Sequence, residues 1–213
     1  YEYAAQRELT ERNPAKRLKG FVEKRETVHR RALPLSELKT FYQRLKEARI
    51  DPANRMALLL LTLTFPRSNE LRGAQWGEID FQAAVWTIPK ERMKMKREHK
   101  IPLSAWSLEL LHELHAITGQ GTQLFPSRTK IGGYISENTL NKIIERIGFK
   151  ELTTLHGFRS LASSTLNEKG FNPDAIELQL AHQPSDKIRA AYNRADYWQE
   201  RVEMMAWYGD LLR

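Results

Sequence analysis

Residues 156–159 contain two side chains that can hold an anion. His156 and Arg159 lie three positions apart at the predicted start of a helix, so both side chains point to one face. The positive end of the helix dipole is next to them and favours a bound negative charge. A His-x-x-Arg pair alone is more often an ordinary surface pair, so its interpretation as an anion site depends on the rest of the chain.

Four further residues extend this set. Arg67 directly precedes a short predicted helix, in which Glu70 can orient the guanidinium. His182 ends a Leu-Ala-His segment, and Tyr192 follows ten residues later. A lone tyrosine is nearly always a packing residue, but the order Arg, His, Arg, His and Tyr in these contexts indicates a chemical role.

The elements that must position these residues are mostly helices. Capping residues (Ser36, Asp51 before Pro52, Ser68, Ser104 and Ser136) and apolar periodicity predict helices at 37–48, 52–65, 69–75, 105–118, 137–147 and 156–169, with further helices beginning at 172–173, 184–185 and 196. The period changes to two at 78–80, 85–88 and 99–103, which predicts a small three-stranded antiparallel sheet. The predicted fold class is mainly α with this small sheet, an α+β architecture.

Composition narrows the class of partner. The 213 residues hold 34 Lys and Arg against 26 Asp and Glu, a net charge of +8, with 41% apolar residues and no Cys. Disulfides, thiolate metal sites and cysteine nucleophiles are therefore excluded. The longest apolar stretch, 56–65, is far shorter than the roughly 20 residues of a membrane helix, so no membrane partner is expected. The excess of positive charge favours nucleic acid.

The positive charge gathers in two places, and one of them lies between predicted domains. Residues 1–31 hold nine Lys and Arg against five Glu, and residues 91–100 hold five against two. Residues 1–13 are predicted to be the end of a helix, residues 14–32 a basic linker, and residues 33–213 the compact domain. We expect Lys16, Arg17 and Lys19 of the linker to contact a phosphate backbone.

Several segments resemble one known family. The sequence is similar to the tyrosine recombinases, or phage integrases, and most of all to prophage and genomic-island integrases of the P4 type. The similar segments are residues 67–76, 86–94 with 99–104, 155–159 (Leu-His-Gly-Phe-Arg), 166–174, and 180–195. The resemblance implies the catalytic-domain fold of these enzymes for residues 33–213, and it implies that residues 1–13 end the core-DNA-binding domain that precedes it.

The resemblance also implies roles for individual residues. Tyr192 matches the nucleophile that forms a 3′-phosphotyrosine. Arg67 and Arg159 match the two arginines that clamp the phosphate, and Lys94 matches the general acid for the 5′-oxygen. His156 and His182 match the two histidines that assist proton movement. Lys96 and Lys100 belong to the same loop as Lys94 and are alternatives for the acid as well as candidate DNA contacts. Tyr197 is the alternative nucleophile.

The chemistry implied by the family needs no metal or cofactor. Two guanidiniums and two imidazoles can stabilise the negative charge of a pentavalent phosphorane by preorganised donors. His112 and His115 lie at i and i+3 with acidic residues nearby, but no third ligand stands at a suitable spacing, so a solvated helix face is the favoured interpretation.

The resulting functional hypothesis is site-specific DNA recombination in the bacterial cytoplasm, integrating or excising a mobile element. Partners implied by the resemblance are double-stranded attachment sites, a homotetramer on DNA, and accessory bending or directionality factors. A catalytically silent DNA-binding module and a type IB topoisomerase are the alternatives. Residues 197–212 are predicted to form an amphipathic helix that packs either on its own domain or on a neighbouring subunit.

Overall fold

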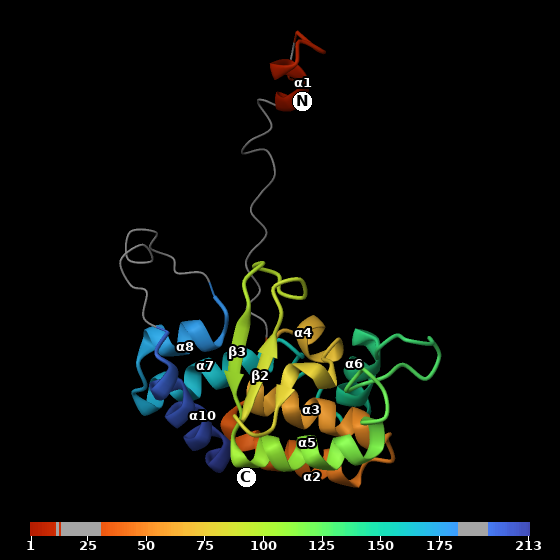
Figure 1. Ribbon diagram of the computed structural model, residues 1–213, viewed down its shortest axis with the longest axis vertical. Helices are drawn as coiled ribbons and strands as arrows, with labels where there is room; N and C mark the ends of the chain where they lie inside the picture. The colour runs from red at the N-terminus through yellow and green to blue at the C-terminus, as the bar shows by residue number, and fades with distance from the viewer. Residues whose placement is uncertain (12, 14–30, 183–195) are drawn as a thin grey trace.

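The computed structural model describes residues 1–11, 13, 31–182 and 196–213, and the fold is given for these residues (Figure 1). The helices are α1 (Glu2–Gln6), α2 (Leu38–Glu47), α3 (Pro52–Thr64), α4 (Ser68–Arg72), α5 (Ala105–Thr118), α6 (Glu137–Arg146), α7 (Gly157–Lys169), α8 (Pro173–Gln179) and α10 (Trp198–Leu212), with 3-10 turns η1 (Leu35–Glu37) and η2 (Trp76–Glu78). The mainly helical fold predicted from the sequence is confirmed.

Side-chain caps start α3, α5 and α6 where the sequence predicts them. The Asp51 carboxylate accepts a hydrogen bond from the Asn54 amide before α3, and Pro52 occupies the first helical position. The hydroxyls of Ser104 and Ser136 cap α5 and α6 in the same way. These bonds satisfy amides that have no partner within the helix.

One small sheet interrupts the helices. β1 (Ile79–Asp80), β2 (Val85–Ile88) and β3 (His99–Pro102) pair antiparallel in that order, as predicted. In the β2–β3 ladder Trp86 faces Ile101, and Ile88 faces His99. The turn that joins these two strands projects beyond the helical body (Figure 1).

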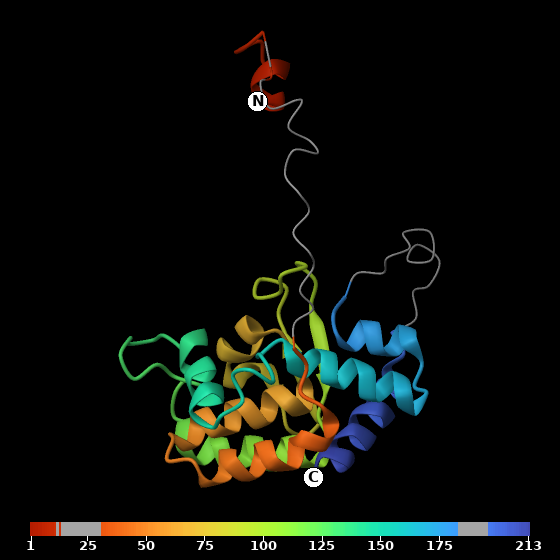
Figure 2. The same cartoon turned by 180° about the vertical axis from the view of Figure 1, so that it is seen from behind.

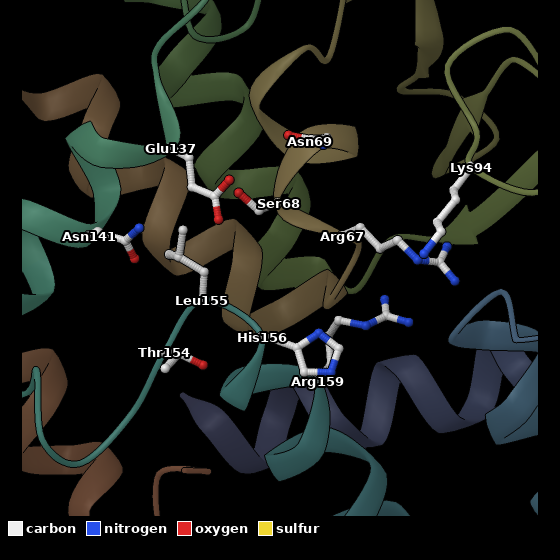
Figure 3. Close-up of a pocket in the computed structure, with 10 residues that line it drawn as sticks. All are labelled: Arg67, Ser68, Asn69, Lys94, Glu137, Asn141, Thr154, Leu155, His156 and Arg159. Carbon is white, nitrogen blue, oxygen red and sulfur yellow. The ribbon is translucent and has the colours of Figure 1, made fainter. Parts of the chain in front are cut away.

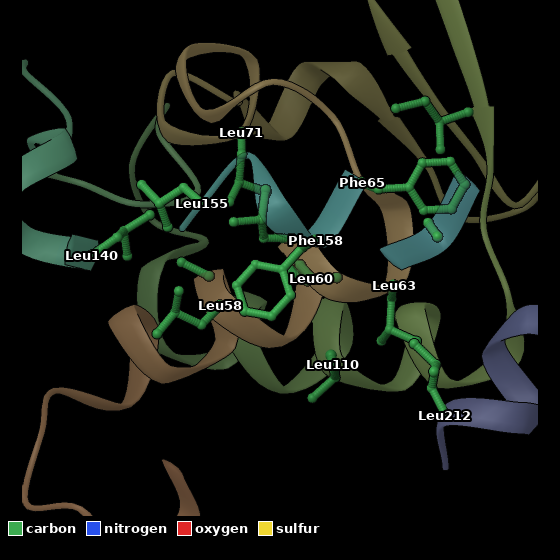
Figure 4. Close-up of a cluster of buried hydrophobic side chains, with 14 of the residues drawn as sticks. Leu58, Leu60, Leu63, Phe65, Leu71, Leu110, Leu140, Leu155, Phe158 and Leu212 are labelled. Carbon is green, nitrogen blue, oxygen red and sulfur yellow. The ribbon is translucent and has the colours of Figure 1, made fainter. Parts of the chain in front are cut away.

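The core lies around α3, the apolar run of the sequence. This helix packs against α4, α5, α6, α7 and α10, and α7 lies above α2 and α3 when the molecule is seen from behind (Figure 2). Leu58, Leu61 and Phe158 are completely buried there, and Figure 4 shows part of this cluster. The rigid interior positions α4 and α7, which carry most of the predicted chemical residues.

Several helix boundaries differ from the prediction. Ser36 does not cap α2, which starts at Leu38 because residues 35–37 form η1, and α4 ends at Arg72 and not at residue 75. α1 ends at Gln6 and does not continue to residue 13, because Glu8 takes a left-handed backbone conformation (φ 55°). The cap of α4 is Arg67 and not Ser68, since the Glu70 carboxylate accepts a hydrogen bond from the Arg67 amide. α10 starts at Trp198 after Tyr197, whose φ is 48°. The helix expected from 184–185 lies outside the described residues.

The last helix packs on its own chain. α10 contacts α3, α5, α8 and β3 and buries Met204, Met205, Tyr208 and Leu212. Of the two arrangements that the sequence leaves open, the structure shows packing in cis. No helix among the described residues is long and apolar enough to cross a membrane.

Candidate active site

Four of the chemical residues predicted from the sequence line one cleft. Its volume is about 720 Å³, and Arg67, Lys94, His156 and Arg159 gather at one end of it (Figure 3). These residues come from the start of α4, the β2–β3 turn and the first turn of α7. Polar side chains line the remainder: Ser68, Asn69, Glu137, Asn141 and Thr154.

Arg159 is the most deeply placed of the four, with 3% of its surface exposed. Its Nη1 donates to the Phe65 carbonyl and its Nη2 to the Leu180 carbonyl, both at 2.6 Å. Burial, followed by the nearby positive charge of Arg67, lowers the pKa of the Arg159 guanidinium to about 10. The group is therefore still positive at neutral pH, and two carbonyls fix its plane.

Arg67 is held from two sides. Its Nη1 donates to Glu70 Oε1 at 3.0 Å, and Nη2 donates to the Ala181 carbonyl at 3.0 Å. Oε2 of the same buried carboxylate accepts the Arg67 backbone amide at 2.7 Å. Glu70 thus both caps α4 and orients the guanidinium, the contact expected from the spacing of these two residues.

The two histidines flank Arg159. His156 is exposed at the N-terminus of α7 and lines both the main cleft and a smaller one of about 210 Å³, which also contains His182. The Arg159 guanidinium can only donate, so His182 Nε2 accepts its bond at 3.3 Å. The proton of the His182 ring is then on Nδ1, which donates to the Glu177 carboxylate at 2.8 Å.

Of the three lysines considered for the general acid, Lys94 alone lines the cleft. It is exposed in the β2–β3 turn, and its side chain points toward the end of the cleft that Arg67 lines (Figure 3). Lys96 is exposed in the same turn with φ 54°. Lys100 is in β3, with its ammonium 3.8 Å from Glu98.

Other predicted residues fall elsewhere. Tyr192, Lys16, Arg17 and Lys19 lie outside the described residues. Tyr197 is half-buried, with its hydroxyl 3.4 Å from Asp174. The rings of His112 and His115 pack on aromatic neighbours, at 4.5 Å from Phe81 and 4.7 Å from Trp76. No group of three or more His, Asp or Glu that could hold a metal is found in the described part of the chain.

Sequence reasoning missed the supports behind the site. His99 is 8% exposed, and its Nε2 lies 3.1 Å from the Gln179 carbonyl. Burial, followed by the positive charge of Arg201, lowers the pKa of His99 to about 3, so the ring is neutral and Nε2 donates to that carbonyl. The surroundings of the cleft also include Gln179, Arg201 and Glu177. Their distances along the sequence from the cleft residues form no recognisable motif. Only the fold brings them together.

Comparison with known proteins decides the family. The model of the phage integrase family matches residues 31–198, which include every proposed catalytic residue. The chain belongs to the phage integrase family. It is 38% identical to the integrase of Enterobacteria phage P4 over 226 aligned positions, covering 99% of this chain and 52% of that protein. It is 41% identical to prophage integrase IntA of Escherichia coli (strain K12) over 169 residues, covering 79% and 41%.

Solved structures share the fold of this integrase chain. The Tn1549 transposon integrase in complex with a circular intermediate DNA superposes with a TM-score of 0.70 at 17% identity, covering 95% of this chain and 74% of the other. A λ integrase dimer bound to a core site superposes with a TM-score of 0.65 at 21% identity, covering 86% and 67%. The integrase chain spans about half the length of the curated relatives it matches.

Proposed function

We propose that this chain is the catalytic part of a site-specific DNA recombinase, which integrates or excises a prophage or genomic island through a 3′-phosphotyrosine intermediate. One observation carries the proposal: two oriented guanidiniums, an ammonium and an imidazole meet at one end of a cleft, on a chain of the phage integrase family. Planar guanidiniums match the oxygens of a phosphate better than an ammonium does.

The arginines provide the electrostatic part of the reaction. Each terminal nitrogen of a guanidinium carries two N–H groups, and each Nη of Arg67 gives one to the described residues, so one remains on each for a non-bridging oxygen. Arg159 retains one such group on Nη1. These donors are oriented before DNA binds, so they stabilise the charge of the phosphorane without reorganisation.

Proton transfer completes the proposed step. The Tyr192 hydroxyl oxygen attacks the scissile phosphorus, the bond from phosphorus to the 5′-oxygen breaks, and the leaving oxygen takes a proton from Lys94. The proton of Tyr192 is accepted by His156, or by His182 once its Nε2 is released from Arg159. A tyrosine hydroxyl, with a reference pKa near 10, needs surrounding positive charge to ionise. Rejoining reverses these transfers with the 5′-hydroxyl of the exchanged strand. The phosphotyrosine conserves the energy of the phosphodiester bond.

The substrate proposed for this chemistry is double-stranded attachment-site DNA in the cytoplasm, held by a homotetramer with accessory factors. Residues 1–13 would end the preceding DNA-binding domain, and the linker 14–32 would cross the phosphate backbone. Phosphate contacts are proposed for Lys16, Arg17, Lys19, Lys96 and Lys100. Binding driven by such contacts weakens steeply as salt is raised.

The test is covalent capture on a nicked attachment-site duplex, which traps the phosphotyrosine because the short cleaved strand diffuses away. We expect the parent to form an adduct that survives denaturation and Tyr192→Phe to form none. The matched control, Tyr197→Phe, should form the adduct at the parental rate. An adduct that persists in Tyr192→Phe would move the nucleophile elsewhere. Binding without an adduct, also in a chain with its full N-terminal region, would favour the silent module, and relaxation of plasmids that lack the site would favour a topoisomerase.

A further inference from the structure

Arg201 of α10 is a buried charge that has no ion pair within the described part of the chain. Its surface is 6% exposed, and no carboxylate of the described residues lies within ion-pairing distance of it. Its Nε and Nη2 both donate to the side-chain oxygen of Gln179, at 2.9 and 2.7 Å, and Nη2 also donates to the Lys100 carbonyl. A buried guanidinium with only neutral acceptors is a weak source of stability, because its desolvation cost is large.

The glutamine that receives these bonds is the last residue of α8. From this point, three consecutive carbonyls point to residues already described. The Gln179 carbonyl accepts from His99, the Leu180 carbonyl from Arg159, and the Ala181 carbonyl from Arg67. The last turn of α8 therefore holds both guanidiniums of the cleft through its main chain.

We propose that Arg201 and Gln179 are positioning residues, which fix the last turn of α8 against β3 and α10 and so orient the Arg67 and Arg159 guanidiniums toward the scissile phosphate. This inference rests on the proposed function, because it concerns the same phosphate. Neither residue lines the cleft.

The three carbonyls belong to one short stretch of backbone, so they move together. A rotation of this turn would shift the acceptors of both guanidiniums at once. Misplacement of a reacting group by about 1 Å can cost about 100-fold in rate. The bonds from Arg201 resist such a rotation by joining the Gln179 side chain to the backbone of β3 at Lys100.

The first experiment compares Arg201→Met with the matched control Arg55→Met. Arg55 also donates to two main-chain carbonyls, those of Leu45 and Ala48, but it does so at the junction of α2 and α3, away from the cleft. Hydrogen exchange of residues 176–182 is measured first, since the amides of 180–182 bond within this turn. We expect Arg201→Met to raise exchange here more than elsewhere, and Arg55→Met to leave these amides protected.

The functional arm follows adduct formation on the nicked duplex at saturating DNA. Arg201→Met is expected to slow it about 10- to 100-fold with DNA affinity unchanged, and Arg55→Met to leave it at the parental rate. On a duplex with a neutral methylphosphonate at the scissile position, the loss should shrink, because less charge there depends on the guanidiniums. If Arg201 had a purely structural role, its loss would slow adduct formation on both duplexes by the same factor.

The double variant Gln179→Leu with Arg201→Met separates stability from positioning. Replacing a buried polar pair by apolar side chains is often neutral or stabilising. The unfolding free energy of the double variant should therefore be close to that of the parent. Adduct formation should stay slow, since the turn has lost its tie to β3. Recovery of the rate together with stability would overturn the inference, as would parental rates in Arg201→Met. If the parent forms no adduct, also in a chain with its full N-terminal region, the proposed function is overturned instead.

Discussion

The two sides of the cleft differ in how firmly they hold their charged groups. On the α8 side, Arg159 is buried between two carbonyls and Arg67 is fixed by Glu70 and a third carbonyl. Opposite them, Lys94 is exposed in a turn and has no hydrogen bond or ion pair with the described residues. In the proposed reaction, the charge that would bind the phosphate is oriented before DNA arrives, whereas Lys94, the proposed proton donor, would take its final position with the substrate.

The base of that turn is nevertheless anchored. Met93 is buried beside Lys94, and Arg92 pairs with Glu78 of η2 and donates to the main chain of α4 at Glu70. The freedom on this side is therefore restricted to the tip of the turn. The following predictions test this contrast between the fixed and the adaptable side, in order of decreasing effect.

The largest effect is expected for Arg159→Lys, which keeps the charge and removes the planar fork. An ammonium cannot bond both the Phe65 and the Leu180 carbonyls and still face a phosphate oxygen. We expect adduct formation to slow by about 1,000-fold. Single-turnover cleavage of the nicked duplex measures it, with the exposed Arg146→Lys on α6 as control. A loss below tenfold would show that charge, and not orientation, is what this position supplies.

His99 provides a stability test of the fixed side. Its pKa is lowered to about 3 in the fold but is near 6.5 in an unfolded chain, so only the unfolded state gains a proton between these values. Acid should therefore destabilise the parent relative to His99→Gln, which keeps a donor for the Gln179 carbonyl without titrating. The difference in unfolding free energy should grow by about 1.4 kcal/mol per pH unit below 6.5, to about 3 kcal/mol at pH 4.

Chemical denaturation at several pH values measures this difference. His112→Gln is the matched control, because the same substitution is then made at an exposed ring. Parallel stability profiles for the parent and His99→Gln would contradict a neutral, buried His99.

On the adaptable side, Lys94→Met should slow cleavage by about 100-fold, the range for loss of a general acid. A duplex with sulfur in place of the scissile 5′-oxygen should restore most of the rate, since a thiolate leaves without a proton. Lys96→Met and Lys100→Met are the controls; they lose only proposed DNA contacts, so at saturating DNA they should cleave the ordinary duplex close to the parental rate. Rescue by the sulfur substrate in either control, with none in Lys94→Met, would transfer the role to that lysine.

The smallest effect is expected for Glu70→Gln. The amide keeps one oxygen as an acceptor but turns an N–H₂ group toward the Arg67 guanidinium or the Arg67 amide. We expect adduct formation to slow about tenfold, by analogy with other residues that orient an active group. Glu137→Gln is the control, because Glu137 lines the same cleft with an exposed carboxylate. Equal rates for these two variants would mean that Glu70 serves α4 alone.

The sequence predicts the features that depend on neighbouring residues in the chain. The helix caps at Asp51, Ser104 and Ser136 are local signals, and the structure places them where expected. The arginine and histidine positions of the cleft stand in short motifs that resemble a family, so they too could be found. The predicted first helix is longer than α1, because nothing in its composition predicts the left-handed backbone of Glu8.

The surroundings of the site could not be predicted. Arg201 and Gln179 are 22 residues apart and meet only through the packing of α10 on α8. Three acceptors of these guanidiniums, at Phe65, Leu180 and Ala181, are main-chain oxygens, which every residue type provides equally. No pattern of side chains therefore records that Leu180 and Ala181 orient arginines.

The same feature determines how the protein tolerates genetic change. A codon change at position 180 or 181 alters a side chain but leaves the carbonyl that holds Arg159 or Arg67 in place. An insertion or deletion near the end of α8 shifts the register of the backbone and displaces both oxygens. At positions 180 and 181, the distance along the chain from the end of α8 is therefore what brings each carbonyl to its arginine.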